Sequence, residues 1–141
     1  SAERLHTACT KGHQNVVEAI LSKNQPPSVL NAKNNMGWTP LHAAIAEGHL
    51  KIAELLLRQS LIDVRVANKD NNAPIHFLAR QVDSPENLSR RALQLRVFNM
   101  LIQRGSSVYC RNRNGEYPLH LAAWKGNAPL VKACLKHCIH P

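Results

Sequence analysis

Apolar residues recur in adjacent pairs, four residues apart, at four places along the chain. The spacing i, i+1, i+4, i+5 places one broad apolar face on an α-helix. The four sets are Val16/Val17 with Ile20/Leu21, Ile52/Ala53 with Leu56/Leu57, Val97/Phe98 with Leu101/Ile102, and Leu130/Val131 with Cys134/Leu135. A shorter stretch rich in small residues precedes each set, at 7–11, 43–47, 77–81 and 121–125. The pattern predicts four helix pairs, each a short helix followed by an amphipathic one.

A four-residue phrase opens each helix pair. It reads Thr39-Pro40-Leu41-His42, Ala73-Pro74-Ile75-His76 and Tyr117-Pro118-Leu119-His120, with a worn first copy at Glu3-Arg4-Leu5-His6. The histidines at 6, 42, 76 and 120 are 36, 34 and 44 residues apart. Self-similarity near this period indicates stacked repeats rather than a single closed globule.

The positions of proline and glycine fit this division. Proline suits the first turn of a helix, where its missing N–H would be unpaired anyway. Gly12, Gly48 and Gly126 fall between the two helices of a pair, where a tight turn favours glycine. The stretches 31–37, 68–72 and 112–115 are rich in Asn and Gly, which tolerate left-handed backbone, and they predict projecting hairpins.

Together these features resemble the ankyrin repeat family, over essentially the whole chain. The strongest unit runs from Asn34 through Thr39-Pro40-Leu41-His42 and Gly48-His49 to Leu57. The resemblance implies an all-α fold with short β-hairpin loops, an ankyrin-type helical repeat solenoid. We expect a single domain over 1–141, with repeats at about 1–33, 34–67, 68–111 and 112–141. Because the last repeat stays apolar where an end repeat is usually polar, we expect the chain to be a segment of a longer protein.

The third repeat departs from the pattern. Ten residues separate the histidine from the apolar pair in three repeats (6→16, 42→52, 120→130), whereas 21 separate them in the third (76→97). The 11 extra residues lie within 81–96. Ser84-Pro85-Glu86 has the composition of a helix start, so we predict a second helix that begins about three turns early and protrudes. A loop followed by a helix of normal length is the alternative.

Composition narrows the class of protein. The 141 residues are 44% apolar, enough for one core, and no apolar run approaches a membrane span. The four cysteines lack the spacing of a disulfide framework, which indicates a reducing intracellular compartment. We expect the cytoplasm, and the nucleus is the alternative. The net charge of +9 is uneven, with eight Lys/Arg against six Asp/Glu in 1–70 and ten against three in 71–141. This basic half could steer an acidic partner or simply keep the surface soluble.

The sequence predicts no catalytic, cofactor-binding or metal-binding residue. The repeated histidines are better explained as hydrogen-bonding struts, and in the ankyrin family this residue typically ties the helix pair to a hairpin backbone. Cys134 and Cys138 with His137 or His140 match no common zinc module, and Cys134 occupies one of the repeated apolar positions of the second helix, which predicts a buried thiol. We find no phosphate loop, carboxylate pair or Ser/His/Asp pattern, and therefore expect neither an enzyme nor a small-molecule substrate.

The resemblance also implies where a partner would bind, because hairpin tips and first-helix ends line the concave side of such stacks. These positions are Asn35, Met36, Trp38, Lys69, Asp70, Asn72, Arg80, Arg113, Asn114, Glu116, Trp124 and Lys125. Both tryptophans of the chain fall in this set. Tryptophan is enriched in binding hot spots, which makes the two residues candidate anchors. Alternatively, each ring covers a neighbouring repeat as a lid.

Two function classes follow. The first is a monomeric, non-enzymatic scaffold or adaptor that binds another protein, one with an acidic or mixed surface and an apolar anchor. The second is a basic surface for anionic lipid headgroups or another polyanion, formed by arginines near the hairpins (Arg80, Arg104, Arg111 and Arg113) and on the long helix (Arg90, Arg91 and Arg96). With 4% aromatic residues, nucleic-acid recognition is disfavoured. A purely structural spacer is a third possibility.

Overall fold

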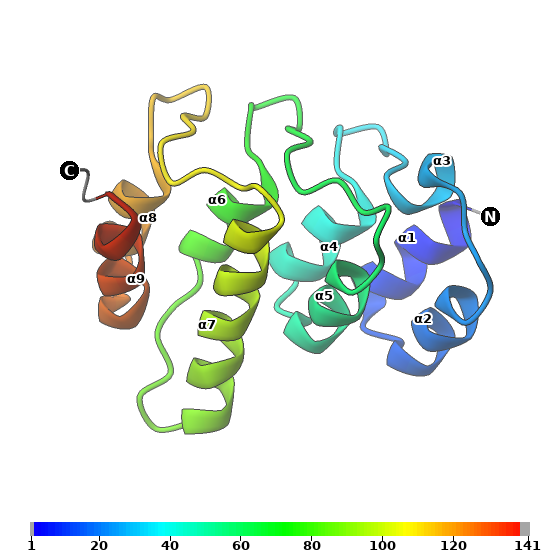
Figure 1. Cartoon of the computed structure of the whole chain (residues 1–141), viewed down its shortest axis with the longest axis horizontal. Coiled ribbons are helices and arrows are strands. Elements are labelled where there is room, and N and C mark those ends of the chain that lie inside the picture. The colour runs from blue at the N-terminus through cyan, green and yellow to red at the C-terminus, as the bar shows by residue number, and fades with distance from the viewer. Residues whose placement is uncertain (1, 139–141) are drawn as a thin grey trace.

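The computed structural model describes residues 2–138, with side chains through residue 137, as a two-layer row of helices (Figure 1). The helices are α1 (Ala2–Lys11), α2 (Gln14–Leu21), α3 (Pro27–Leu30), α4 (Pro40–Ala46), α5 (Leu50–Leu57), α6 (Pro74–Ala79), α7 (Leu88–Gln103), α8 (Pro118–Trp124) and α9 (Ala128–Cys138). In sequence order, α1, α4, α6 and α8 pack side by side as the first-helix layer. The second-helix layer consists of α2, α5, α7 and α9. The predicted helical repeat solenoid is confirmed.

The boundaries of the helices follow the predicted chemistry. Pro40, Pro74 and Pro118 are the first residues of α4, α6 and α8, each after a residue with extended backbone. The turns inside the helix pairs place Gly12, Gly48 and Gly126 at φ of 77°, 79° and 69°. One element was not predicted: α3 is a single turn after the second helix of the first pair. No helix in residues 2–138 combines the length and the hydrophobicity that crossing a membrane requires.

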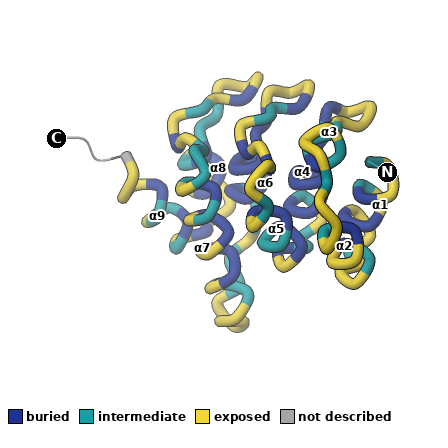
Figure 2. The backbone as a smooth tube through the Cα atoms, turned by 45° about the vertical axis from the view of Figure 1, so that its right-hand side comes forward, coloured by how far each residue is buried: buried dark blue, intermediate teal, exposed yellow. Residues whose placement is uncertain are grey.

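The apolar pairs form one core that runs along the row between the two layers. Leu5, Leu41 and Ile75 occupy one register position of the first helices, and each is at most 1% exposed, whereas Leu119 at the same position of α8 is partly buried. The second helices contribute Val17, Leu56, Leu101 and Cys134, all 0% exposed. Buried positions recur along every layer in Figure 2, whereas the loop tips are largely exposed. Cys134 is buried as predicted, and at Cys9 burial raises the pKa of the thiol to about 12.

The repeated histidines at 6, 42 and 76 are struts between repeats, as predicted, whereas His120 accepts the Tyr117 N–H at 3.2 Å, just before its own helix. His42 Nε2 lies 2.9 Å from the carbonyl oxygen of Asn72, in the next loop, and its Nδ1 accepts the N–H of Thr39 at 3.0 Å. His76 repeats both contacts, to the Cys110 oxygen at 2.9 Å and the Ala73 N–H at 3.0 Å. His6 Nε2 lies 2.7 Å from the oxygen of Ala32. The rings of His6, His42 and His76 therefore each fix a first helix to the following loop.

The predicted hairpins are tight turns without strand, since no β-ladder occurs in the described residues. One asparagine organises each turn by accepting the backbone N–H groups two and four residues later. Asn34, Asn68 and Asn112 do so at 2.9–3.0 Å. Successive turns are joined through the Lys69 N–H to the Met36 oxygen at 3.4 Å and the Arg113 N–H to the Asp70 oxygen at 2.8 Å. The loops therefore form a connected row along one edge of the molecule (Figure 1).

Gly37 has no room for a side chain at the junction between two loops. Its φ is +79°, and a Cβ there would lie 3.0 Å from the Lys69 nitrogen and 3.2 Å from the Asn68 Cα. Gly115 has a similar φ of +76°, but a Cβ would meet nothing within 4 Å. We expect Gly37→Ala to lower the free energy of unfolding by about 2 kcal/mol and Gly115→Ala by about 1 kcal/mol. Urea denaturation of the two variants tests this, and equal losses would show that the contact between the loops is unimportant.

The insertion in the third repeat lengthens the second helix. Both α2 and α5 begin two residues before their apolar pair, which would place the start of α7 at Leu95. It begins instead at Leu88, seven residues or about two turns earlier, and projects beyond its neighbours (Figure 1). The predicted helix extension is confirmed, but the predicted start at Ser84-Pro85 is wrong. The cap is Asn87, whose Oδ1 accepts the Arg90 N–H at 3.0 Å, and residues 84–87 form a turn closed by the Asn87 N–H to the Ser84 oxygen at 3.0 Å.

Candidate partner-binding surface

Half of the predicted partner-binding residues lie at the tips of three successive loops. They are exposed and comprise Asn35, Met36, Lys69, Asp70, Arg113 and Asn114. Met36 is 58% exposed. The Arg113 guanidinium donates to the Lys69 oxygen at 2.6 Å and lies 3.5 Å from the Asp70 carboxylate. The structure thus brings these side chains together in one strip with an ordered backbone.

Asn72 belongs to the interior rather than to this surface. It is only 4% exposed, and its Oδ1 accepts the Asn112 amide at 3.0 Å and the Arg80 guanidinium at 3.4 Å. Its carbonyl is the partner of His42. The sequence-based placement of Asn72 on the binding surface is therefore corrected, because the side chain is needed to join two loops and is covered by them.

Trp38 covers the neighbouring repeat, which is the second of the two alternatives that the sequence allowed. Its half-buried ring packs on Phe77, with centroids 5.0 Å apart and planes inclined by 55°. Phe77 also meets the edge of His42 at 5.4 Å and lies under the Arg80 guanidinium at 5.6 Å. Much of the Trp38 ring is thus engaged within the fold.

Trp124 differs, because the residue is 78% exposed. It is the last residue of α8, and the Lys125 ammonium lies 5.4 Å from the ring centroid. Trp38 immediately precedes Thr39, the N-cap of α4, and α6 packs between α4 and α8. The two tryptophans therefore lie at opposite helix ends, two repeats apart, and do not form a single anchor.

Glu116 carries a fixed charge at the base of the last loop. Its Oε1 accepts the Asn112 amide at 2.8 Å. This bond, with smaller contributions from Asn114, Arg80 and His76, holds the pKa of the carboxyl below its ordinary value, although desolvation opposes the shift. Glu116 therefore stays negatively charged among the Lys and Arg side chains of the third and fourth repeats.

The cysteines and histidines were the candidates for reactive or metal-binding side chains. Burial raises the pKa of the half-buried Cys110 thiol, which donates to the Ser107 oxygen at 3.0 Å. In the described part of the chain, no group of three or more His, Cys, Asp or Glu side chains could hold a metal ion. His140 and the side chain of Cys138 lie outside the described residues.

Sequence reasoning missed a buried polar pair, Gln94 and Asn127, which are 1% and 0% exposed. Asn127 donates to the Gln81 oxygen at 2.9 Å and to the Gln94 side chain at 3.2 Å. Gln94 donates to the Val82 oxygen at 3.0 Å. The available signal was the change from Gly-His to Gly126-Asn127 in the repeat that follows the insertion.

Models of ankyrin repeats match two segments, residues 3–70 and residues 94–134. Together these segments cover most of the chain, and they flank the insertion. With the stacked helix pairs, the histidine struts and the loop row, they define the class: the chain belongs to the ankyrin repeat family.

Three relatives show the breadth of this family. A probable serine/threonine-protein kinase of Dictyostelium discoideum is 29% identical over 90% of this chain and 14% of its own length. NF-kappa-B inhibitor zeta of Mus musculus is 32% identical over 94% of this chain and 16% of its own length. The B-cell lymphoma 3 protein homolog of Mus musculus is 28% identical over 94% of this chain and 27% of its own length. The chain thus spans less than a third of each relative.

Proposed function

We propose that the chain is one ankyrin repeat domain that acts as a monomeric, non-enzymatic protein-interaction module inside the cell, in a scaffold or adaptor. The partner contacts the loop tips and the Trp124 end of the first-helix layer. The observation that carries this proposal is the exposure of Trp124, at 78%. An exposed indole is unfavourable in water and is the side chain most enriched in binding hot spots.

The chemistry of the surface describes the partner. Met36 and Trp124 offer apolar contacts, while Lys69, Asp70 and Lys125 are exposed charges of both signs. A partner with a mixed or acidic surface and one apolar anchor point would complement them. One relative is named an inhibitor of NF-kappa-B, which fits an interaction role for a related domain.

Trp124→Ala is expected to weaken binding to the partner by at least about tenfold without lowering stability. The partner is first captured from cell lysate with the whole chain, and the affinity of the purified pair is then measured by calorimetry. Trp38→Ala is the matched variant: it removes the contact with Phe77 and should lower the melting temperature. Leu61→Ala, which changes another exposed apolar residue (51% exposed), should do neither. Undiminished affinity of the Trp124→Ala variant would remove this residue from the interface.

A further inference from the structure

A groove separates α7 from α9 on the second-helix layer, away from the loop tips. Its volume is about 550 Å³. One wall is a stripe of every fourth residue on α7, namely Arg91, Leu95 and Asn99. The other wall is the facing stripe of α9, with Pro129, Lys132, Ala133, Lys136 and His137. The groove is hollow because α9 presents alanine, at 128 and 133, where longer side chains would fill it.

The neighbouring junction in the same layer is bridged. Between α5 and α7, the Arg96 Nε contacts the Glu54 carboxylate, which is only 12% exposed. No described residue makes an equivalent ion pair across the groove between α7 and α9. The sequence thus closes one junction with opposite charges and leaves the next one open.

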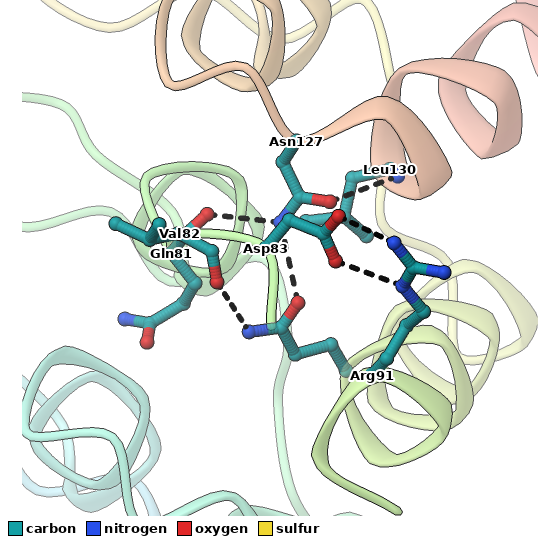
Figure 3. A network of polar contacts seen from close by, with 7 residues as sticks. Gln81, Val82, Asp83, Arg91, Asn127 and Leu130 are labelled. Atoms are coloured by element: carbon teal, nitrogen blue, oxygen red, sulfur yellow. Dashed lines mark hydrogen bonds and ion pairs between the residues drawn. The ribbon is translucent and has the colours of Figure 1, made fainter. Parts of the chain in front are cut away.

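The open groove is basic. Arg91, Lys132 and Lys136 line it, and no Asp or Glu does. Arg91 is neutralised, because its guanidinium donates twice to Asp83, at 2.9 and 2.7 Å (Figure 3). Lys132 and Lys136 are exposed, and no acidic side chain of the described residues lies within ion-pair distance of either. They are one helical turn apart, so their charges stand side by side on one rim.

The groove is also held in shape. At the end of the groove where α9 begins, the buried Gln94–Asn127 pair joins α7 to the start of α9 and to residues 81–82 of the insertion. The same asparagine accepts the Leu130 N–H at 3.3 Å (Figure 3). At the other end, the His137 ring lies 6.0 Å from Phe98. A preorganised groove loses little freedom when it binds, which favours affinity.

We propose that this groove binds an acidic segment of a partner protein. Carboxylates of the segment would face Lys132 and Lys136, and an apolar side chain would rest on Leu95 and Ala133. A peptide fits this shape better than a membrane does, because the apolar floor is recessed between two helices and a flat bilayer surface reaches only projecting groups. The groove is separate from the loop tips and Trp124. It would therefore be a second binding site, and its test does not depend on the interface proposed above.

The test is a selection from a displayed library of random peptides of about 15 residues against the whole chain, followed by fluorescence anisotropy with the enriched peptides. We expect these to be acidic with at least one large apolar residue. We expect Lys132→Glu with Lys136→Glu to weaken their binding at least about tenfold. The matched control, Lys23→Glu with Lys51→Glu, makes the same charge change at exposed positions elsewhere and should leave the affinity within about twofold.

Ala128→Trp fills the groove without changing the charge, and it should also weaken binding at least about tenfold. Ala128 is an exposed first residue of its helix, so the fold should tolerate the change, which a thermal melt verifies. Equal losses with both charge variants, or full binding by the Ala128→Trp variant, would overturn the proposal. So would enrichment of neutral peptides alone, or binding to phosphatidylserine vesicles that falls with the groove variants while no acidic peptide binds.

Discussion

Acidification from pH 6.5 to pH 4 is expected to remove about 3 kcal/mol of stability through His42 alone. Desolvation of this fully buried ring lowers its pKa from 6.5 to about 4, against the effect of the Asn72 hydrogen bond. Nearby positive charge from Lys33, His6 and His76 contributes in the same direction as burial. The folded pKa lies below the unfolded one, so the unfolded chain binds more protons in this window. The contribution of His42 to stability is therefore present above pH 6.5. It is lost as the pH falls, until His42 is protonated in both the folded and the unfolded chain.

The geometry of His42 explains why the charged form is excluded. Its Nδ1 accepts the Thr39 N–H at 3.0 Å, so that nitrogen carries no proton, and Nε2–H donates to the Asn72 carbonyl. A second proton would point at the Thr39 N–H and would lie in the core. Burial is also the main cause that lowers the pKa of His76. Protonation of His76 on acidification therefore lowers the stability of the fold further, in addition to the effect of His42.

His42→Gln isolates this contribution, because glutamine can accept and donate similar hydrogen bonds without titrating near neutral pH. The variant should be less stable than the wild type at pH 7, and its free energy of unfolding should change less between pH 6.5 and 4. Urea denaturation across this range gives the slopes, and carboxylates that titrate in both proteins cancel in the difference. His120→Gln makes the same substitution at an exposed repeat position and is measured beside it. Parallel profiles for the wild type and the His42→Gln variant would contradict the assignment.

The fold was predictable because its determinants repeat. The histidine phrases at 39–42 and 73–76 each set a helix start and a strut at once, and each apolar pair sets the inward face of a second helix. One copy of the motif would leave the type and ends of an element uncertain, but four aligned copies support the same assignment. The helix pairs and their glycine turns could therefore be placed without the structure.

The insertion was harder because it occurs once. Ser84-Pro85-Glu86 resembles a helix start as well as Asn87 does, and local chemistry alone does not choose between them. The choice depends on contacts across the sequence: Arg91 holds Asp83, and Gln94 holds the Val82 carbonyl. These bonds keep residues 82–83 in a loop against α7.

The binding surface was only partly predictable, for a similar reason. Trp38 and Trp124 were equivalent candidates in the sequence, yet in the described residues Trp38 packs on Phe77 of the next repeat, whereas Trp124 is exposed. Asn72 looked like a tip residue, but its amide is shared with Asn112 and Arg80 inside the loop base. Which side chain a neighbouring repeat covers depends on both repeats, and no single copy of the motif contains that information.

Arg104 shows most clearly that a charge counted as surface can belong to the fold. Its guanidinium donates to four carbonyl oxygens, those of Leu57, Gln59, Ser60 and Ile62. These groups follow the end of α5, where helix carbonyls lack partners and the helix dipole is negative. The side chain of the third repeat thus caps a helix of the second, and the arginine contributes little to the basic surface.

Arg104→Met is expected to lower the free energy of unfolding by about 3 kcal/mol, since it leaves several partly buried carbonyls without a donor but keeps most of the stem. Arg104→Lys should recover only part of this loss, because one ammonium cannot reach all four oxygens as the planar fork does. Arg58→Met is the matched control: that side chain is 63% exposed and lies 3.8 Å from Glu54, and such pairs contribute at most about 1 kcal/mol. Guanidinium denaturation at pH 7 compares the three. If Arg104→Met is no more destabilising than Arg58→Met, the four carbonyl contacts of Arg104 do not stabilise the junction between the second and third repeats. A larger loss, only partly recovered in the Arg104→Lys variant, assigns that junction to the guanidinium.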